Sequence, residues 1–138
     1  MTGTLYLIPN TLGHSEASNP LAHIIPDTVQ KMSAQLSYFV AENAKTTRAF
    51  LKILNQNHPL AKPLQELHIA ELNVNTPTEA LNNLIEPLLQ GYDVGLISEA
   101  GVPAVADPGA NLVRLAHQKN IIVRPLVGPS SLLLALMG

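Results

Sequence analysis

The stretch that decides the expected fold is Asp93-Val-Gly-Leu-Ile-Ser-Glu-Ala-Gly-Val-Pro-Ala-Val-Ala-Asp-Pro-Gly109. Its apolar start, Val94 to Ser98, predicts a buried strand, and its end predicts a helix capped by Asp107 with Pro108 at the first helical position. The loop between them is about twice as long as the usual two to six residues of such connections. In open α/β sheets, ligands bind in loops at the carboxyl ends of strands, so we expect this loop to bind a ligand.

Further strands and helices alternate along the whole chain. Apolar runs predict strands at Thr4–Ile8, Ser37–Ala41, Glu66–Ala70, Val94–Ser98 and Ile121–Leu126. Helices are predicted at Asp27–Leu36, Thr47–Asn55, Thr76–Gln90, Pro108–Lys119 and from Pro129 onward. Apolar strands that alternate with helices indicate an α/β fold: a mostly parallel five-stranded sheet with helices on both faces, an αβα sandwich.

One predicted helix carries signals for both of its ends. Thr76-Pro-Thr-Glu79 fits a capping box at its start, and Gly91 is expected to end it. Pro87 lies inside this helix and is expected to kink it.

The composition indicates one folded domain. The 138 residues are 46% hydrophobic and 13% charged, and no apolar run approaches the length of a membrane span. The start lacks the basic segment of a signal peptide and the chain has no cysteine, so we expect a cytoplasmic protein. The net charge of −2, with only eight Lys and Arg residues, argues against non-specific nucleic-acid binding by this domain alone.

The last residues, Gly128-Pro-Ser-Ser-Leu-Leu-Leu-Ala-Leu-Met-Gly138, predict a helix without a polar face. Such a helix needs another surface to cover it. We therefore expect residues 1–138 to be the N-terminal domain of a longer polypeptide whose C-terminal domain is absent from this chain. A natural chain end that docks in a homodimer is the alternative.

Common catalytic motifs are missing from the sequence. No serine lies in a Gly-x-Ser-x-Gly elbow, and neither a Gly-x-Gly-x-x-Gly nor a Gly-x-x-x-x-Gly-Lys motif is present. The five histidines lack the spacing of a zinc helix, so no metal site is expected.

Three loops at predicted strand ends remain as the candidate site: Pro9–Gly13, Ser98–Gly109 and Val127–Ser131. In a parallel sheet they would lie along one edge. Their main-chain groups, hydroxyls and few charges suit a neutral or zwitterionic ligand rather than a polyanion.

The last two loops resemble a known family. Ser98-Glu-Ala-Gly-Val-Pro-Ala-Val-Ala-Asp-Pro-Gly109 and Pro125-Leu-Val-Gly-Pro-Ser-Ser131 are similar to motifs of the tetrapyrrole methylase superfamily, the class III S-adenosylmethionine-dependent methyltransferases. With the start Gly3-Thr-Leu-Tyr-Leu-Ile-Pro9 and Gly13, the resemblance is strongest to the ribosomal RNA small subunit methyltransferase I branch. It spans essentially the whole chain. It implies an N-terminal αβα domain that pairs with a C-terminal domain, a cleft for S-adenosylmethionine between the two, and a homodimer.

The resemblance also implies roles for individual residues. The residues expected to border the methyl donor are Pro9, Gly13, Ser98, Glu99, Ala100, Gly101, Val102, Pro103, Gly128, Pro129 and Ser130. The implied acceptor is a ribose 2′-hydroxyl of small-subunit ribosomal RNA. Catalytic residues stay unassigned: Glu42 is a candidate acid on the substrate side, and an exposed strand end explains it nearly as well. A porphyrin- or corrin-type small-molecule methyltransferase and a non-catalytic ligand-binding module are the alternative functions.

The chain also departs from the branch. Glu99 stands where the branch has Asp, and the branch's Glu-Asp-Thr-Arg is matched only loosely by Glu42-Asn-Ala-Lys-Thr-Thr-Arg48, with Asn43 in place of the acid. The loop from His14 to Pro26 is longer or differently arranged. These changes lie where the substrate would be handled, so the resemblance supports methyl-donor binding better than the identity of the substrate.

Overall fold

One parallel sheet organises the protein. The computed structural model describes residues 1–8, 27–73, 75–97 and 107–126. Its strands are β1 (Thr4–Ile8), β2 (Tyr38–Ala41), β3 (His68–Glu71), β4 (Val94–Ile97) and β5 (Ile122–Pro125). They form a five-stranded sheet in the order β3-β2-β4-β1-β5, and every pairing is parallel. The predicted sheet is confirmed, and each predicted strand agrees with the observed one within two residues at either end.

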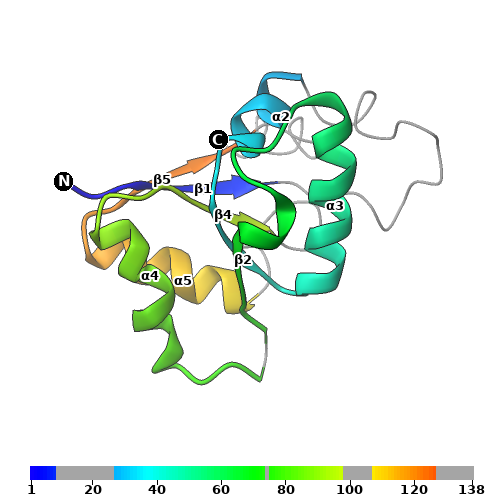
Figure 1. Cartoon of the computed structure of the whole chain (residues 1–138). Helices are drawn as coiled ribbons and strands as arrows, with labels where there is room; N and C mark the ends of the chain where they lie inside the picture. Colours follow the sequence, from blue (N-terminus) through cyan, green and yellow to red (C-terminus); the bar gives the residue numbers. More distant parts are fainter. Residues whose placement is uncertain (9–26, 74, 98–106, 127–138) are drawn as a thin grey trace, which may run out of the picture.

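Helices cover both faces of this sheet (Figure 1). They are α2 (Asp27–Ala34), α3 (Ala44–Asn57), α4 (Ala80–Leu89) and α5 (Asp107–Gln118), with a short 3₁₀ turn, η2, at Leu64–Glu66. α2 and α3 pack on one face, and α4 and α5 pack on the other. The αβα arrangement predicted from the sequence is therefore confirmed.

Alternating strand residues divide the core into two clusters. On one face, Ile8, Phe39 and Ile97 pack against Phe50 and Leu54 of α3. The cluster on the other face consists of Leu5, Val40, Leu72, Leu81, Ile85, Leu88, Val94, Leu96, Leu112, Ala116 and Ile121. Strands buried on both faces need apolar residues at every position, which explains the unbroken apolar runs in the sequence.

The helix that precedes β4 ends as the sequence predicts. Gly91 has φ +100°, and its N–H donates to the carbonyl of Leu88 at 3.1 Å. The N–H of Tyr92 donates to the carbonyl of Pro87 at 2.9 Å. This pair of bonds is a Schellman motif, which closes the carbonyl end of α4 and turns the chain into β4.

The start of α4 differs from the prediction. The helix begins at Ala80, and Glu79 makes no side-chain capping bond, so the capping box over residues 76–79 is wrong. Thr76 instead belongs to a preceding turn, where its Oγ1 accepts the N–H of Asn73 at 3.0 Å. The Asn73 Oδ1 accepts the N–H of Asn75 at 2.9 Å. Asn and Thr side chains that bond to nearby main chain compete with helix formation in this way.

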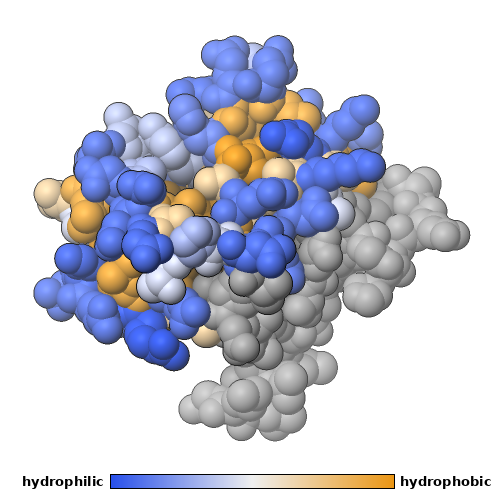
Figure 2. Space-filling view, turned by 90° about the horizontal axis from the view of Figure 1, so that it is seen from below, coloured by the Kyte–Doolittle hydropathy of each residue, from blue (hydrophilic) through white to orange (hydrophobic). Residues whose placement is uncertain are grey.

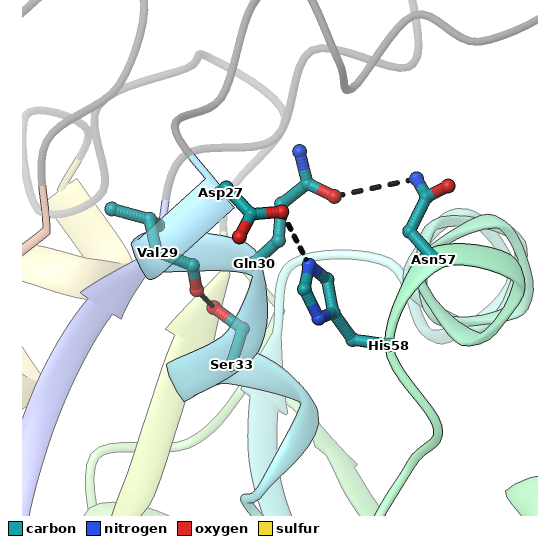
Figure 3. Close-up of polar contacts among 6 residues, drawn as sticks. All are labelled: Asp27, Val29, Gln30, Ser33, Asn57 and His58. Carbon is teal, nitrogen blue, oxygen red and sulfur yellow. Dashed lines mark hydrogen bonds and ion pairs between the residues drawn. The ribbon is translucent and has the colours of Figure 1, made fainter.

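Polar contacts tie α2 to α3 on the outer side of the sheet (Figure 3). The Nε2 of His58 lies 2.7 Å from the Oδ1 of Asp27, at the start of α2. One turn along, the Nδ2 of Asn57 donates to the Oε1 of Gln30 at 3.3 Å. These contacts link the first turn of α2 with the end of α3.

The face of the described residues seen in Figure 2 is predominantly hydrophilic. In Figure 2 hydrophilic side chains surround smaller hydrophobic patches. None of the helices among the described residues is long and apolar enough to cross a membrane.

Candidate functional site

Three of the five strands end side by side at the carboxyl edge of the sheet. β1 lies between β4 and β5, with Ile8 paired to Ile97 and Leu7 paired to Pro125. The N–H of Leu126 donates to the carbonyl of Leu7 at 2.9 Å, which keeps the chain beside β1 after β5 ends. Because neighbouring strands lie about 4.8 Å apart, the ends of these three strands lie within about 10 Å of one another.

These three strand ends are the points from which the predicted site loops depart. Those loops supply the residues expected to border the methyl donor: Pro9, Gly13, Ser98, Glu99, Ala100, Gly101, Val102, Pro103, Gly128, Pro129 and Ser130. All of them lie outside the described residues. Their roles therefore stay predictions, while the adjacency of the strands that carry them is a property of the described sheet.

Glu42, the candidate acid, lies at the same edge. It follows the last residue of β2, and its N–H donates to the carbonyl of Ile97 at 3.2 Å. This bond continues the β2–β4 pairing by one residue and holds the backbone of Glu42 beside the end of β4. The side chain is half-buried. The structure thus places Glu42 beside the end of β4, and its chemical role stays a prediction.

Asn43 caps α3, which the sequence analysis missed. Its Oδ1 accepts the N–H of Lys45 at 2.9 Å and that of Thr46 at 3.2 Å. The Oε2 of Glu71, at the end of β3, accepts the N–H of Ala44 at 2.9 Å. Helix α3 therefore starts three residues before the predicted Thr47. The signal was an Asn directly before an amphipathic segment, the usual signature of an N-cap.

The cap makes a testable prediction about Asn43. Replacing Asn43 with alanine removes the acceptor for two helix N–H groups and should lower the free energy of unfolding by about 1 kcal/mol. Asn43→Asp, which restores the acid of the related branch, keeps the acceptor and should stay within about 0.5 kcal/mol of the parent chain. Denaturant unfolding measures both. Equal losses in the two variants would contradict the capping role.

The described part of this edge is apolar and acidic. Ile8, Ala41 and Ile97 are buried where the strands end, and Glu42 and Glu71 supply carboxylates. Within the described ranges, no three His, Cys, Asp or Glu residues gather as a metal site would require. These strand ends suit a cationic or neutral ligand better than a polyanion.

Proteins named ribosomal RNA small subunit methyltransferase I match this chain over nearly its whole length, whereas no protein-family model matches it. The one from Xylella fastidiosa is 34% identical over 97% of this chain and 43% of its own length. The one from Halalkalibacterium halodurans is 32% identical, and that from Haemophilus influenzae is 29% identical, each over 99% of this chain and 42% of the relative. The chain thus spans about two fifths of the length of these relatives. By sequence it is a homologue of proteins named ribosomal RNA small subunit methyltransferase I.

Proposed function

We propose that this chain forms half of the S-adenosylmethionine cleft of a methyltransferase that modifies small-subunit ribosomal RNA at a ribose 2′-hydroxyl, in the cytoplasm. The observation that carries the proposal is the match, over nearly the whole chain, to proteins named ribosomal RNA small subunit methyltransferase I. The adjacent ends of β4, β1 and β5 support the position of the cleft, because ligands in open α/β sheets bind outside the carboxyl ends of strands.

The proposed chemistry is a direct methyl transfer. The hydroxyl oxygen bonds to the methyl carbon as the carbon–sulfur bond breaks, the sulfonium becomes a neutral thioether, and the hydroxyl proton passes to a base or to water. This chain would contribute alignment, since the loops after β1, β4 and β5 start from a rigid parallel sheet. Glu42 is the described side chain that we propose to face the acceptor.

The test uses the complete gene product. Calorimetry should show binding of S-adenosylmethionine, and labelled methyl groups should pass to small ribosomal subunits prepared from cells that lack the protein. Digestion of the RNA should then yield a 2′-O-methylated nucleoside. A methylated base would overturn the ribose assignment, and transfer to a tetrapyrrole instead would favour a small-molecule enzyme. Donor binding without transfer to either substrate would favour a non-catalytic module, and absent donor binding would overturn the proposal.

We also propose that the complete protein is a homodimer, as the family resemblance implies. Light scattering at the concentration of the activity assay should give twice the mass of the polypeptide. A monomer mass in active samples would overturn this assignment.

A substitution at Gly101 tests the proposed role of the loop after β4. Gly101→Val places a branched side chain where we propose that backbone approaches the donor, and it should raise the Kd for S-adenosylmethionine at least tenfold, about 1.4 kcal/mol. Ala61→Val is the control, because it also introduces a valine but lies outside the proposed donor site. Ala61 is exposed, and its N–H donates to the carbonyl of Ala34, at the end of α2. Circular dichroism checks that both variants are folded. An unchanged Kd in folded Gly101→Val protein would remove this loop from the donor site.

A further inference from the structure

The exposed face of α3 carries three cations in a row. Lys45, Arg48 and Lys52 are all exposed, whereas Phe50, Leu54 and their neighbours on the opposite face are buried. At 100° per residue, the spacing of three and seven positions places the three side chains within about 60° around the helix axis. The row extends for about 10 Å along the helix. We call these three residues the basic face of α3.

This basic face lacks balancing acids on its own helix. From Asn43 to Pro63 the sequence contains Lys45, Arg48, Lys52 and Lys62 and no Asp or Glu. Among the described residues, the ion pair found is that between His58 and Asp27, and none involves the basic face. In a protein with a net charge of −2, three of the eight Lys and Arg residues thus lie on one helix face.

The basic face starts at the edge where the predicted cleft lies. α3 begins two residues after Glu42, whose N–H bonds to the end of β4. The carboxylate of Glu71 bonds the N–H of Ala44 at the same end. Arg48 and Lys52 follow further along the helix, which forms the outer layer on its side of the sheet (Figure 1).

We propose that the basic face of α3 binds the phosphate backbone of the RNA substrate and directs it toward the carboxyl edge of the sheet. This inference depends on the proposed function for the identity of the RNA. Lys and Arg contacts to phosphates position an RNA without reading its sequence, and they supply much of the affinity. The charges complement a polyanion, while the acidic strand ends beside them do not. The RNA backbone would therefore lie along α3 and reach the edge with one nucleotide.

The test compares two double variants of the complete gene product. Arg48→Gln with Lys52→Gln removes two charges from the basic face and leaves Lys45, which lies nearest the carboxylates. Arg114→Gln with Lys119→Gln removes the same two residue types from exposed positions on and just after α5, on the other side of the sheet. Both pairs change the net charge equally, so a general electrostatic effect would appear in both.

The measured quantity is the Kd for small ribosomal subunits, by filter binding at several potassium chloride concentrations. Removing two phosphate contacts should weaken binding about tenfold at low salt and lower the slope of log Kd against log salt by about 1.4 to 1.8. The α5 pair should change the Kd less than twofold, and both variants should bind S-adenosylmethionine like the parent protein.

The outcomes separate this inference from the proposed function. If the parent protein methylates the subunits and the Arg48→Gln, Lys52→Gln variant binds and methylates them equally well, the proposed role of the basic face is overturned. The proposed function would then still stand. Parent protein that binds the donor but neither binds nor methylates subunits would overturn the proposed substrate. Equal losses in the α3 and α5 pairs, or α3-dependent binding to anionic lipid vesicles without binding to subunits, would also overturn the inference.

Discussion

Replacing Gly3 with alanine is expected to lower the free energy of unfolding by about 3 kcal/mol or more. A Cβ at this position would lie 1.9 Å from the carbonyl oxygen of Tyr92 and 2.9 Å from the nitrogen of Asp93. Both are backbone atoms of the segment that leads into β4, so they cannot rotate away as a side chain can. The N–H of Gly3 also donates to the carbonyl of Leu88 at 2.8 Å.

The Gly3→Ala substitution should also affect the candidate site, because Gly3 fixes the start of β1 against the turn before β4. The N–H of Thr4 donates to the Oδ1 of Asp93 at 2.8 Å, which adds a second tie at the same place. β1 and β4 are the neighbours whose far ends open into two of the predicted ligand loops. A shift at Gly3 therefore disturbs the pairing that positions those loops, and donor binding should weaken together with stability.

Guanidinium unfolding followed by far-ultraviolet circular dichroism measures the effect, since the chain has no tryptophan to serve as a fluorescent probe. Thr2→Ala is the control, because Thr2 is exposed one residue away and its truncation should change stability by less than about 0.5 kcal/mol. A Gly3→Ala variant as stable as the Thr2→Ala control would contradict the close packing at Tyr92.

The strands were predictable from short apolar runs, most clearly at the centre of the sheet, where β4 is buried on both faces. Thr4–Ile8 was predicted with its observed bounds, and Val94 to Ile97 are all buried, as their apolar sequence requires. The order of the strands was not predictable. Apolar side chains on both faces of a strand show that it is buried, but they do not show which strand pairs with it. The pairing of β1 with both β4 and β5 comes from the structure alone.

The ends of the helices were less predictable than their existence. Short polar side chains can hydrogen-bond to several nearby main-chain groups. The sequence alone does not show which of these hydrogen bonds forms. Thr76 resembled a helix cap but joins the turn at Asn73, whereas Asn43 is a cap and was not recognised as one. Gly91 was identified correctly as the end of its helix. Helices commonly end with a residue in the left-handed conformation, which Gly91 adopts, and this residue is usually glycine.

That the strands leading into the candidate site end at one edge of the sheet was predictable, whereas the site itself and its contacts stay predictions. The loop motifs and the fold class together indicated the carboxyl edge, and the adjacent ends of β4, β1 and β5 lie there. The expectation about nucleic acid used the net charge, which averages over the whole surface. That average conceals the local charge of α3, because Arg48 and Lys52 meet on one face only after the helix has formed.

Gly95, at the centre of β4, offers the second large effect. A Cβ there would lie 2.5 Å from the Cδ1 of Ile8, 3.0 Å from the Cδ1 of Leu36 and 3.1 Å from the Cδ1 of Phe39. These atoms are the ends of side chains in the cluster beneath α2 and α3. Gly95→Ala should therefore overpack that cluster and destabilise the protein by about 1–3 kcal/mol, less than the backbone clash at Gly3.

The clash can be assigned to one atom by a double-mutant cycle. Ile8→Val removes the Cδ1 and alone should cost about 0.5–1.5 kcal/mol. Combined with Gly95→Ala it should cost less than the sum of the single changes, with a coupling of at least about 0.5 kcal/mol. Ile85→Val makes the same truncation in the cluster on the other face of the sheet, so its effect should simply add to that of Gly95→Ala. Additivity for Ile8, or equal coupling for Ile85, would mean that the alanine is accommodated by movement of β4 rather than by the side chain of Ile8.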